Sequence, residues 1–180
     1  MLIDYTFFQG GSLDIEGITL NTITPDATST AIVGGLEYFI AKFEPEYLGK
    51  LLGKELSEEF LSYLDRREES EEKEARWEDL ISKLKWTRRI GKKEINLSPI
   101  ANYIYFFYLR HNHAQATTTG VKQDTDDGKL LSPERKMVFA WNNMVEMNKA
   151  LFAWIEYRRC DFPLWNPDID LIERINVMSI

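Results

Sequence analysis

Cysteine and histidine are scarce in this chain, and their scarcity limits the chemistry that it can carry. Of 180 residues, one is a cysteine, Cys160, and two are histidines. A single cysteine excludes an intramolecular disulfide framework and a zinc site built from a cysteine cluster. This usage suits a reducing cytoplasm. No catalytic motif surrounds Cys160, so we expect an unreactive thiol that is buried or half-buried.

Positive charge is also in deficit. The chain has 22 Lys and Arg against 29 Asp and Glu, which gives a net charge of -7 and a sequence pI of about 5.0. Because a broad phosphate-neutralising face needs clustered cations, this composition argues against a large surface for duplex DNA. A local basic patch stays possible at KLKWTRRIGKK, Lys83 to Lys93, which contains no acid. This stretch is too short to carry a nucleic-acid function by itself.

Long apolar runs and enzyme signatures are missing as well. No stretch approaches the roughly 18 apolar residues of a membrane span. The first residues, MLIDYTFFQGG, lack the basic n-region of a signal peptide, so we expect a soluble protein. The chain has neither a phosphate-binding glycine loop nor a G-x-S-x-G motif. We therefore predict no enzyme activity and no catalytic, cofactor-binding or metal-binding residue.

Large apolar side chains, in contrast, are abundant. Hydrophobic residues make up 44% of the chain, with 5 Trp, 8 Tyr and 10 Phe, which is enough for the core of one domain. Their spacing of three and four residues predicts amphipathic helices. We expect a break at Glu44-Pro45, because proline disfavours continuation of a helix. The predicted helices cover residues 28–43, 45–52 (closed by Gly53), a stretch that begins near Lys54 or Ser57 and includes Leu64, and, from Trp77, about 77–84.

Two further stretches predict other structures. DRREESEEKEAR, Asp65 to Arg76, mixes six acids with four bases, and we expect a solvated helix extension or loop. WTRRIGKKEINLS, from Trp86, is typical of a short β-hairpin with Gly91 at its turn.

Two Ser-Pro pairs, Ser98-Pro99 and Ser132-Pro133, mark strong helix starts. Residues 99–114 are apolar or aromatic on nearly every side, which predicts a helix buried at the centre of the domain. After Ser132, an apolar stripe predicts a helix of about 27 residues. The fold class that follows is mainly α: a helical bundle with a central buried aromatic helix, a long C-terminal helix, a short β-hairpin and an extended inter-helix arm.

The predicted domain organisation has three parts. Residues 1–27 form an irregular or extended N-terminal segment, residues 28–159 form the helical domain, and residues 160–180 form an extended C-terminal tail. The arm occupies residues 117–131 within the helical domain.

The letters His111-Asn112-His113 spell HNH, which is the name of a nuclease motif. That motif takes its residues from positions spread over a ββα-metal fold. Here the two histidines are two residues apart on a helix and point to different faces. We expect His111 to continue the buried face and His113 to help cap the carbonyls at the helix end.

The stretch from Asp124 to Gly128 looks like the start of a calcium-binding loop. With Gly128 at position six of an EF-hand, Glu134 falls at position twelve. However, Gln123 and Thr125 then occupy positions one and three, where acidic ligands belong. The residues are more typical of an exposed turn that is rich in Asp and Gly.

Several segments resemble one family of proteins. They are FEPEYLGKLLGKEL (Phe43 to Leu56), SPIANYIYFFYLR (Ser98 to Arg110), TTTGVKQDTDDGKLLSPERK (Thr117 to Lys136) and the final helix. These segments are similar to head–tail connector (adaptor or neck) proteins of tailed phages and prophages of gut Bacteroides-type bacteria. The resemblance spans about residues 36 to 158. It rests on a pattern of helices and a T-x-x-G-V arm, without an enzymatic signature.

The resemblance implies a structural virion protein, a subunit of a ring that docks on the portal and links it to the tail. The implied partners are further copies of the chain, the portal and the tail or neck proteins, with DNA only as cargo in the ring lumen. The implied location is the bacterial host cytoplasm during assembly and then the virion, and no cofactor is implied. The implied partner-binding residues belong to the arm: Thr117, Thr118, Thr119, Gly120, Val121, Lys122, Asp124, Asp126, Asp127 and Gly128.

A second interpretation stays open beside this one. The chain would then be a small non-viral helical binding or regulatory protein with a soluble protein partner. The two interpretations differ in assembly. A connector forms a ring or another multimer, or assembles only on its portal, whereas the regulatory protein is a stable monomer or dimer.

Overall fold

The computed structural model describes residues 1–18, 27–68, 73–118 and 132–179. These ranges hold five α-helices and one two-stranded antiparallel hairpin, which confirms the predicted mainly α fold. Within them, none of the helices has the length and apolar character that a membrane crossing needs. The elements are η1 (Tyr5–Phe8), α1 (Ala27–Leu52), α2 (Lys54–Arg66), α3 (Ala75–Leu84), β1 (Trp86–Ile90), β2 (Lys93–Leu97), α4 (Pro99–Thr118), α5 (Pro133–Tyr157), η2 (Ile169–Ile172) and η3 (Val177–Ser179).

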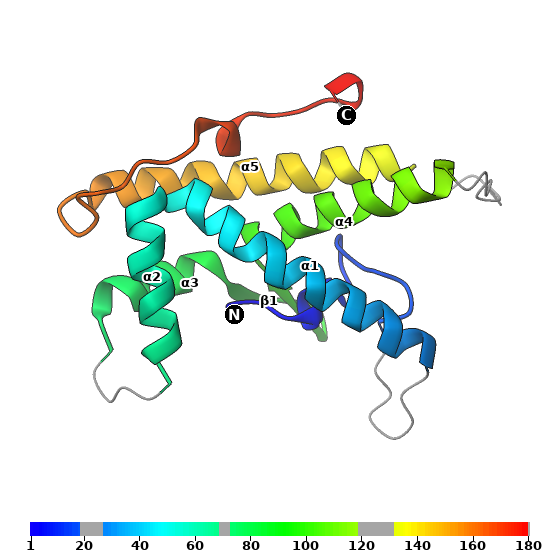
Figure 1. Ribbon diagram of the computed structural model, residues 1–180, viewed down its shortest axis with the longest axis horizontal. Helices are drawn as coiled ribbons and strands as arrows, with labels where there is room; N and C mark the ends of the chain where they lie inside the picture. The colour runs from blue at the N-terminus through cyan, green and yellow to red at the C-terminus, as the bar shows by residue number, and fades with distance from the viewer. Residues whose placement is uncertain (19–26, 69–72, 119–131, 180) are drawn as a thin grey trace.

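Helices α4 and α5 form an antiparallel pair along the long axis of the molecule, and α1 crosses beside them (Figure 1). Helices α2 and α3 lie toward the end where α1 finishes. The hairpin lies on the other side of the α4–α5 pair from the C-terminal tail, which returns along α5 (Figure 1).

The core is built around α4, as the sequence predicts. Residues 100–106 of this helix are buried without interruption, and Tyr103 and Tyr105 are among the largest fully buried side chains. The Ser98 hydroxyl accepts a hydrogen bond from the backbone N–H of Ile100 at 3.1 Å, so it caps the helix as expected. A helix that is apolar all round is therefore surrounded by other elements on all sides.

The predicted break at Glu44-Pro45 is wrong, because α1 is continuous and contains Pro45 in its interior. Proline removes the hydrogen bond to the carbonyl of Ala41, four residues earlier. Ala41 and Pro45 are both exposed, so water reaches this side of the helix. The opposite side buries Leu36 and Tyr47 completely. Burial of that apolar side outweighs the local preference of proline.

Two side chains predicted to be inside lie at the surface. His111 and Cys160 are both exposed, so the predictions of a buried-face histidine and a buried or half-buried thiol are wrong. The fully buried part of α4 ends at Phe106, and the helix continues past the core. His111 therefore meets the Phe39 ring at the surface, with 5.4 Å between the ring centroids. Cys160 falls in the turn that follows α5.

A buried carboxylate fixes the start of the chain. Glu44, which is 2% exposed, accepts hydrogen bonds from the backbone N–H groups of Leu2 at 2.8 Å and Ile3 at 3.2 Å. The Lys85 ammonium donates to the Leu2 carbonyl at 2.9 Å. Burial raises the pKa of Glu44, while these N–H groups and the nearby positive charges oppose the rise. The side chains of Leu2 and Ile3 belong to the core, so the first residues pack into the helical domain.

The C-terminal tail closes the end of α1. The last carbonyls of a helix have no partner within the helix, and here the tail supplies the donors. Gly53 and the tail are therefore in close contact. The three bonds run from the Asp168 N–H to the Lys50 carbonyl (2.7 Å), from the Trp165 indole N–H to the Leu51 carbonyl (2.9 Å) and from the Asn166 N–H to the Leu52 carbonyl (3.2 Å).

This contact makes Gly53 sensitive to substitution. Its φ is +81°, and a Cβ there would lie 2.8 Å from the Asn166 carbonyl oxygen. Gly91, at the hairpin turn, also has a positive φ of +65°, but a Cβ there would meet nothing within 4 Å. In urea denaturation we expect Gly53→Ala to lower the free energy of unfolding by about 3 kcal/mol, and Gly91→Ala by about 1 kcal/mol. An equal loss of unfolding free energy in the two variants would contradict the close contact between Gly53 and Asn166.

Candidate functional site

The predicted arm begins and ends at one extremity of the domain, where the last turn of α4 lies beside the first turn of α5 (Figure 1). Thr117 and Thr118 belong to α4, so the predicted helix end at residue 114 and the predicted arm start at residue 117 are corrected. The Ala- and Gln-containing sequence HAQA favours this continuation of the helix. The other predicted arm residues lie outside the described residues: Thr119, Gly120, Val121, Lys122, Asp124, Asp126, Asp127 and Gly128.

A polar contact joins the two helices at this extremity. His113 Nε2 and Glu134 Oε1 are 3.1 Å apart. Hydrogen bonds from its own backbone N–H and from the Ser132 side chain, together with the nearby His113, lower the pKa of Glu134. His113 thus links α4 to α5 and does not sit at the helix end, because α4 continues beyond it to Thr118. Its predicted role as a cap of the last carbonyls is wrong.

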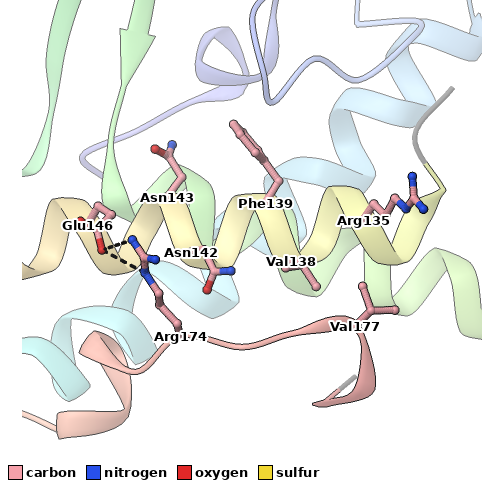
Figure 2. A pocket seen from close by; sticks show the side chains of 8 residues that line it. All are labelled: Arg135, Val138, Phe139, Asn142, Asn143, Glu146, Arg174 and Val177. Carbon is pink, nitrogen blue, oxygen red and sulfur yellow. Dashed lines mark hydrogen bonds and ion pairs between the residues drawn. The ribbon is translucent and has the colours of Figure 1, made fainter. Parts of the chain in front are cut away.

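An open groove runs along the N-terminal half of α5, on the side where the tail returns (Figure 2). The groove has a volume of about 460 Å³. Phe139 and Val177 are about half exposed in it, at 49% and 50%. Exposed apolar side chains with polar neighbours are typical of a contact surface for another protein. The lining residues are Arg135, Val138, Phe139, Asn142, Asn143, Glu146, Arg174 and Val177.

The tail beside this groove is held by backbone hydrogen bonds and by one side-chain ion pair, in which Arg174 lies 2.9 Å from Glu146 (Figure 2). We call Glu173 to Met178 the strap. Asn142 makes two bonds with Ile175: its Nδ2 donates to the carbonyl at 2.9 Å, and its Oδ1 accepts from the N–H at 3.0 Å. The Trp141 indole N–H donates to the Glu173 carbonyl at 2.8 Å. These hydrogen bonds involve no side chain of the strap, so α5 binds it as an extended peptide.

A buried amide anchors the tail just before the strap. Asn148 is 0% exposed; its Oδ1 accepts from the Tyr47 hydroxyl at 2.5 Å, and its Nδ2 donates to the Leu171 carbonyl at 2.9 Å. Burial raises the pKa of Tyr47 far above its ordinary value, so the hydroxyl keeps its proton and remains a donor. One side chain therefore connects α1, α5 and the tail.

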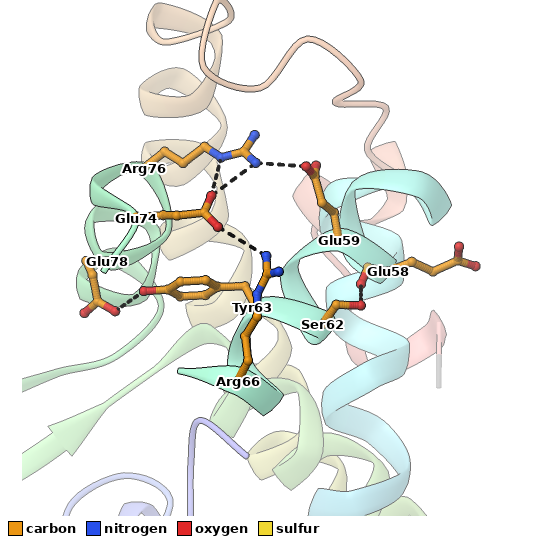
Figure 3. Close-up of polar contacts among 8 residues, drawn as sticks. All are labelled: Glu58, Glu59, Ser62, Tyr63, Arg66, Glu74, Arg76 and Glu78. Carbon is orange, nitrogen blue, oxygen red and sulfur yellow. Dashed lines mark hydrogen bonds and ion pairs between the residues drawn. The ribbon is translucent and has the colours of Figure 1, made fainter. Parts of the chain in front are cut away.

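Ion pairs connect α2 with α3 at the other end of the molecule. Arg67 donates to both oxygens of Glu78, at 2.6 and 2.8 Å, and the Tyr63 hydroxyl donates to the same carboxylate at 2.6 Å. The hydrogen bonds from Arg67 are the main reason that the pKa of Glu78 is lowered to about 2. Further pairs join Arg66 to Glu74 (3.2 Å) and Arg76 to Glu59 (2.9 Å) (Figure 3).

These contacts define what the described surface can do chemically. Within the described ranges, no three His, Cys, Asp or Glu side chains are grouped so that they could hold a metal ion. No protein-family model, curated protein or solved structure matches the chain. The α5 face offers backbone-directed hydrogen bonds and apolar contact, which together suit the binding of a polypeptide.

Sequence reasoning misses the groove and the strap. A signal is present in α5, where Asn142, Asn143 and Asn148 interrupt an apolar stripe. Buried amides require hydrogen-bond partners, so these residues point to a polar contact. Asn142 and Asn148 meet backbone groups of a tail without any periodic pattern, whereas Asn143 donates to the Asn102 side chain on α4. A sequence does not reveal which of these groups a given amide meets.

The Glu78 carboxylate makes folding stability depend on pH. Its pKa falls from 4.5 to about 2 on folding, so its contribution is present above about pH 4.5 and is lost as the pH falls toward 2. The side chain is 28% exposed, and solvent screening leaves about 1 kcal/mol. In urea denaturation across this range, Glu78→Gln should lose that part of the pH dependence. The control Glu59→Gln, at a carboxylate 45% exposed, should keep it. If the free energy of unfolding of Glu78→Gln depends on pH as steeply as that of the wild type, Glu78 is not the group responsible.

Removal of the Asn142 side chain should affect hydrogen exchange in the strap, whereas removal of the Asn148 side chain should affect the stability of the whole domain. We expect Asn142→Ala to loosen the strap and leave the core intact. Hydrogen exchange at the Ile175 amide should rise about thirtyfold, because two bonds of about 1 kcal/mol each are lost. If the hydrogen-exchange rate of the Ile175 amide is unchanged in Asn142→Ala, Asn142 does not hold the strap through its backbone.

Asn148→Ala leaves the Tyr47 hydroxyl and the Leu171 carbonyl buried without a partner. It should lower the free energy of unfolding by about 3 kcal/mol.

Proposed function

We propose that the protein is a structural subunit of a phage or prophage virion: a ring-forming head–tail connector (adaptor) that docks on the portal and links it to the tail. The observation that carries the proposal is the position of the two helix ends that flank the arm. They meet at one extremity of a helical domain, and the α4–α5 pair that bears them contains the buried core of the molecule. A segment placed in this way can contact a neighbour without a change in the core.

The segments that resemble connector proteins support the same interpretation. Phe43 to Leu56 forms the end of α1 and the start of α2, where the tail closes the helix. Ser98 to Arg110 forms the capped, buried half of α4. Two of the family-like segments therefore coincide with well-packed parts of the helical domain.

Exposed apolar side chains supply further support. Large apolar residues at the surface are typical of contacts between chains. Tyr38 is 65% exposed and Tyr157 is 90% exposed, and Phe139 and Val177 add the α5 groove. The net charge of -7 suits a ring whose lumen lets DNA pass without strong adhesion.

The proposal is tested with the portal protein encoded in the same genome. We expect the gene to lie among portal, capsid and tail genes, and the purified chain to form rings alone or on the portal in electron micrographs. A variant with a Gly-Ser linker in place of residues 119–131 should keep the wild-type circular dichroism spectrum. Its affinity for the portal should fall at least about tenfold, which corresponds to about 1.4 kcal/mol of lost contact.

The matched control has the same kind of linker in place of residues 69–72, and it should assemble as the wild type does. Two results would overturn the proposal. One is a gene neighbourhood without portal, capsid or tail genes. The other is a stable monomer or dimer that ignores the portal and binds a soluble partner, which would favour the non-viral binding protein.

A further inference from the structure

The β1–β2 hairpin concentrates positive charge in an acidic protein. We infer that this hairpin is a binding element for the phosphate backbone of duplex DNA. The inference does not rest on the connector assignment, since it follows from the exposure, pairing and placement of the hairpin cations. Its binding is weak and independent of base sequence, as expected for a small cluster of charges. The proposal thus revises the expectation from the sequence that this stretch is too short for a nucleic-acid function, because the hairpin exposes four cations on one ribbon.

The hairpin places its cations on all of its accessible sides. Arg88 and Arg89 are neighbours in β1, so their side chains leave opposite faces of the ribbon. Lys93 pairs with Ile90 in the ladder and therefore shares the Arg88 face, and Lys92 lies in the turn. All four cations are exposed. Nearby, Glu94 adds one acid, opposite Arg89.

Among the described residues, these cations are not neutralised by ion pairs. None of the four forms an ion pair with another described residue. The contrast with the rest of the chain is clear, because most other arginines pair with carboxylates. Those arginines are Arg66, Arg67, Arg76, Arg158, Arg159 and Arg174.

The shape of the hairpin suits a groove of duplex DNA. A two-stranded ribbon fits the major groove, which is about 12 Å wide, and cations on both faces then meet the phosphates on both walls. Two of the cations are arginines, whose planar guanidinium matches phosphate oxygens. Strand β1 is exposed along its whole length, and it forms one edge of the two-stranded sheet. Strand β2 is the one that packs against η1.

A different explanation of the same cations is that they protect the β1 edge from pairing with other strands. The two explanations differ in a measurable way. If the cations only protect the strand edge, their removal causes self-association of the protein and leaves DNA binding unchanged. Phosphate binding predicts a loss of salt-dependent affinity for DNA.

The experiment measures the binding of a short labelled duplex by fluorescence anisotropy, from low salt to physiological salt. Four neutralised phosphates give a slope of log affinity against log salt of about -3.6, so fourfold dilution of the salt tightens binding about 150-fold. In the double variant Arg88→Gln/Arg89→Gln, the same dilution should tighten binding only about 12-fold.

The matched control removes two exposed cations elsewhere, in Arg110→Gln/Lys54→Gln, and should keep the wild-type slope. Circular dichroism checks that all variants fold. The inference is overturned by absence of binding at low salt, by an equal loss of slope in the control, or by self-association of the hairpin variant with unchanged DNA binding. Tighter binding to phosphatidylserine vesicles than to the duplex would also overturn it, because the partner would then be a membrane surface.

Discussion

The hydrogen bonds of one buried side chain, Asn148, set the register between α1, α5 and the C-terminal tail. Apolar burial supplies most of the stability but is non-directional, and it would tolerate small shifts of one element along another. A buried amide that loses its partners costs about 1–3 kcal/mol, so only the arrangement that brings Tyr47 and Leu171 to Asn148 is favourable. The position of the strap follows from this anchor. Asn148 and Asn142 are six residues apart in α5, which is about 9 Å along the helix. The tail between Leu171, which Asn148 binds, and Ile175, which Asn142 binds, can span at most about 14 Å. The Ile175 backbone therefore reaches Asn142 without strain.

Polar groups join distant segments at other points of the fold in the same way. The Glu44 carboxylate holds the backbone of the first residues against α1, and backbone and indole N–H groups of the tail complete the last turn of that helix. Each of these contacts satisfies backbone groups that would otherwise be buried without partners. Residues 2–3 and 165–168 are therefore held against α1, although neither segment has the periodic pattern from which a sequence predicts structure.

This distinction explains how much of the fold could be predicted. The capped start of α4 at Ser98, its buried aromatic run and the hairpin turn at Gly91 depend on local sequence, and the structure confirms them. The predictions for Pro45, His111 and Cys160 failed because each depends on which side of an element other elements cover. The groove was not predicted either, since its wall is formed by a tail whose contacts are made largely by the backbone. The arm from residue 119 to 131 lies outside the described residues, so its role stays a prediction from the sequence.

The two surfaces of the molecule act through forces of different range. On the α5 side, Asn142 holds the strap through hydrogen bonds and the groove offers apolar contact, and both act only at contact distance. On the hairpin side, the exposed cations of the proposed phosphate-binding element act over about 8 Å at physiological ionic strength. The two surfaces lie on opposite sides of the α4–α5 pair (Figure 1). A polypeptide bound on one side leaves the other side accessible, so the fold allows a protein contact and a phosphate contact to be made at the same time. The rigid, aromatic α4–α5 core between them keeps their separation constant, which is the property that a subunit with two simultaneous partners requires.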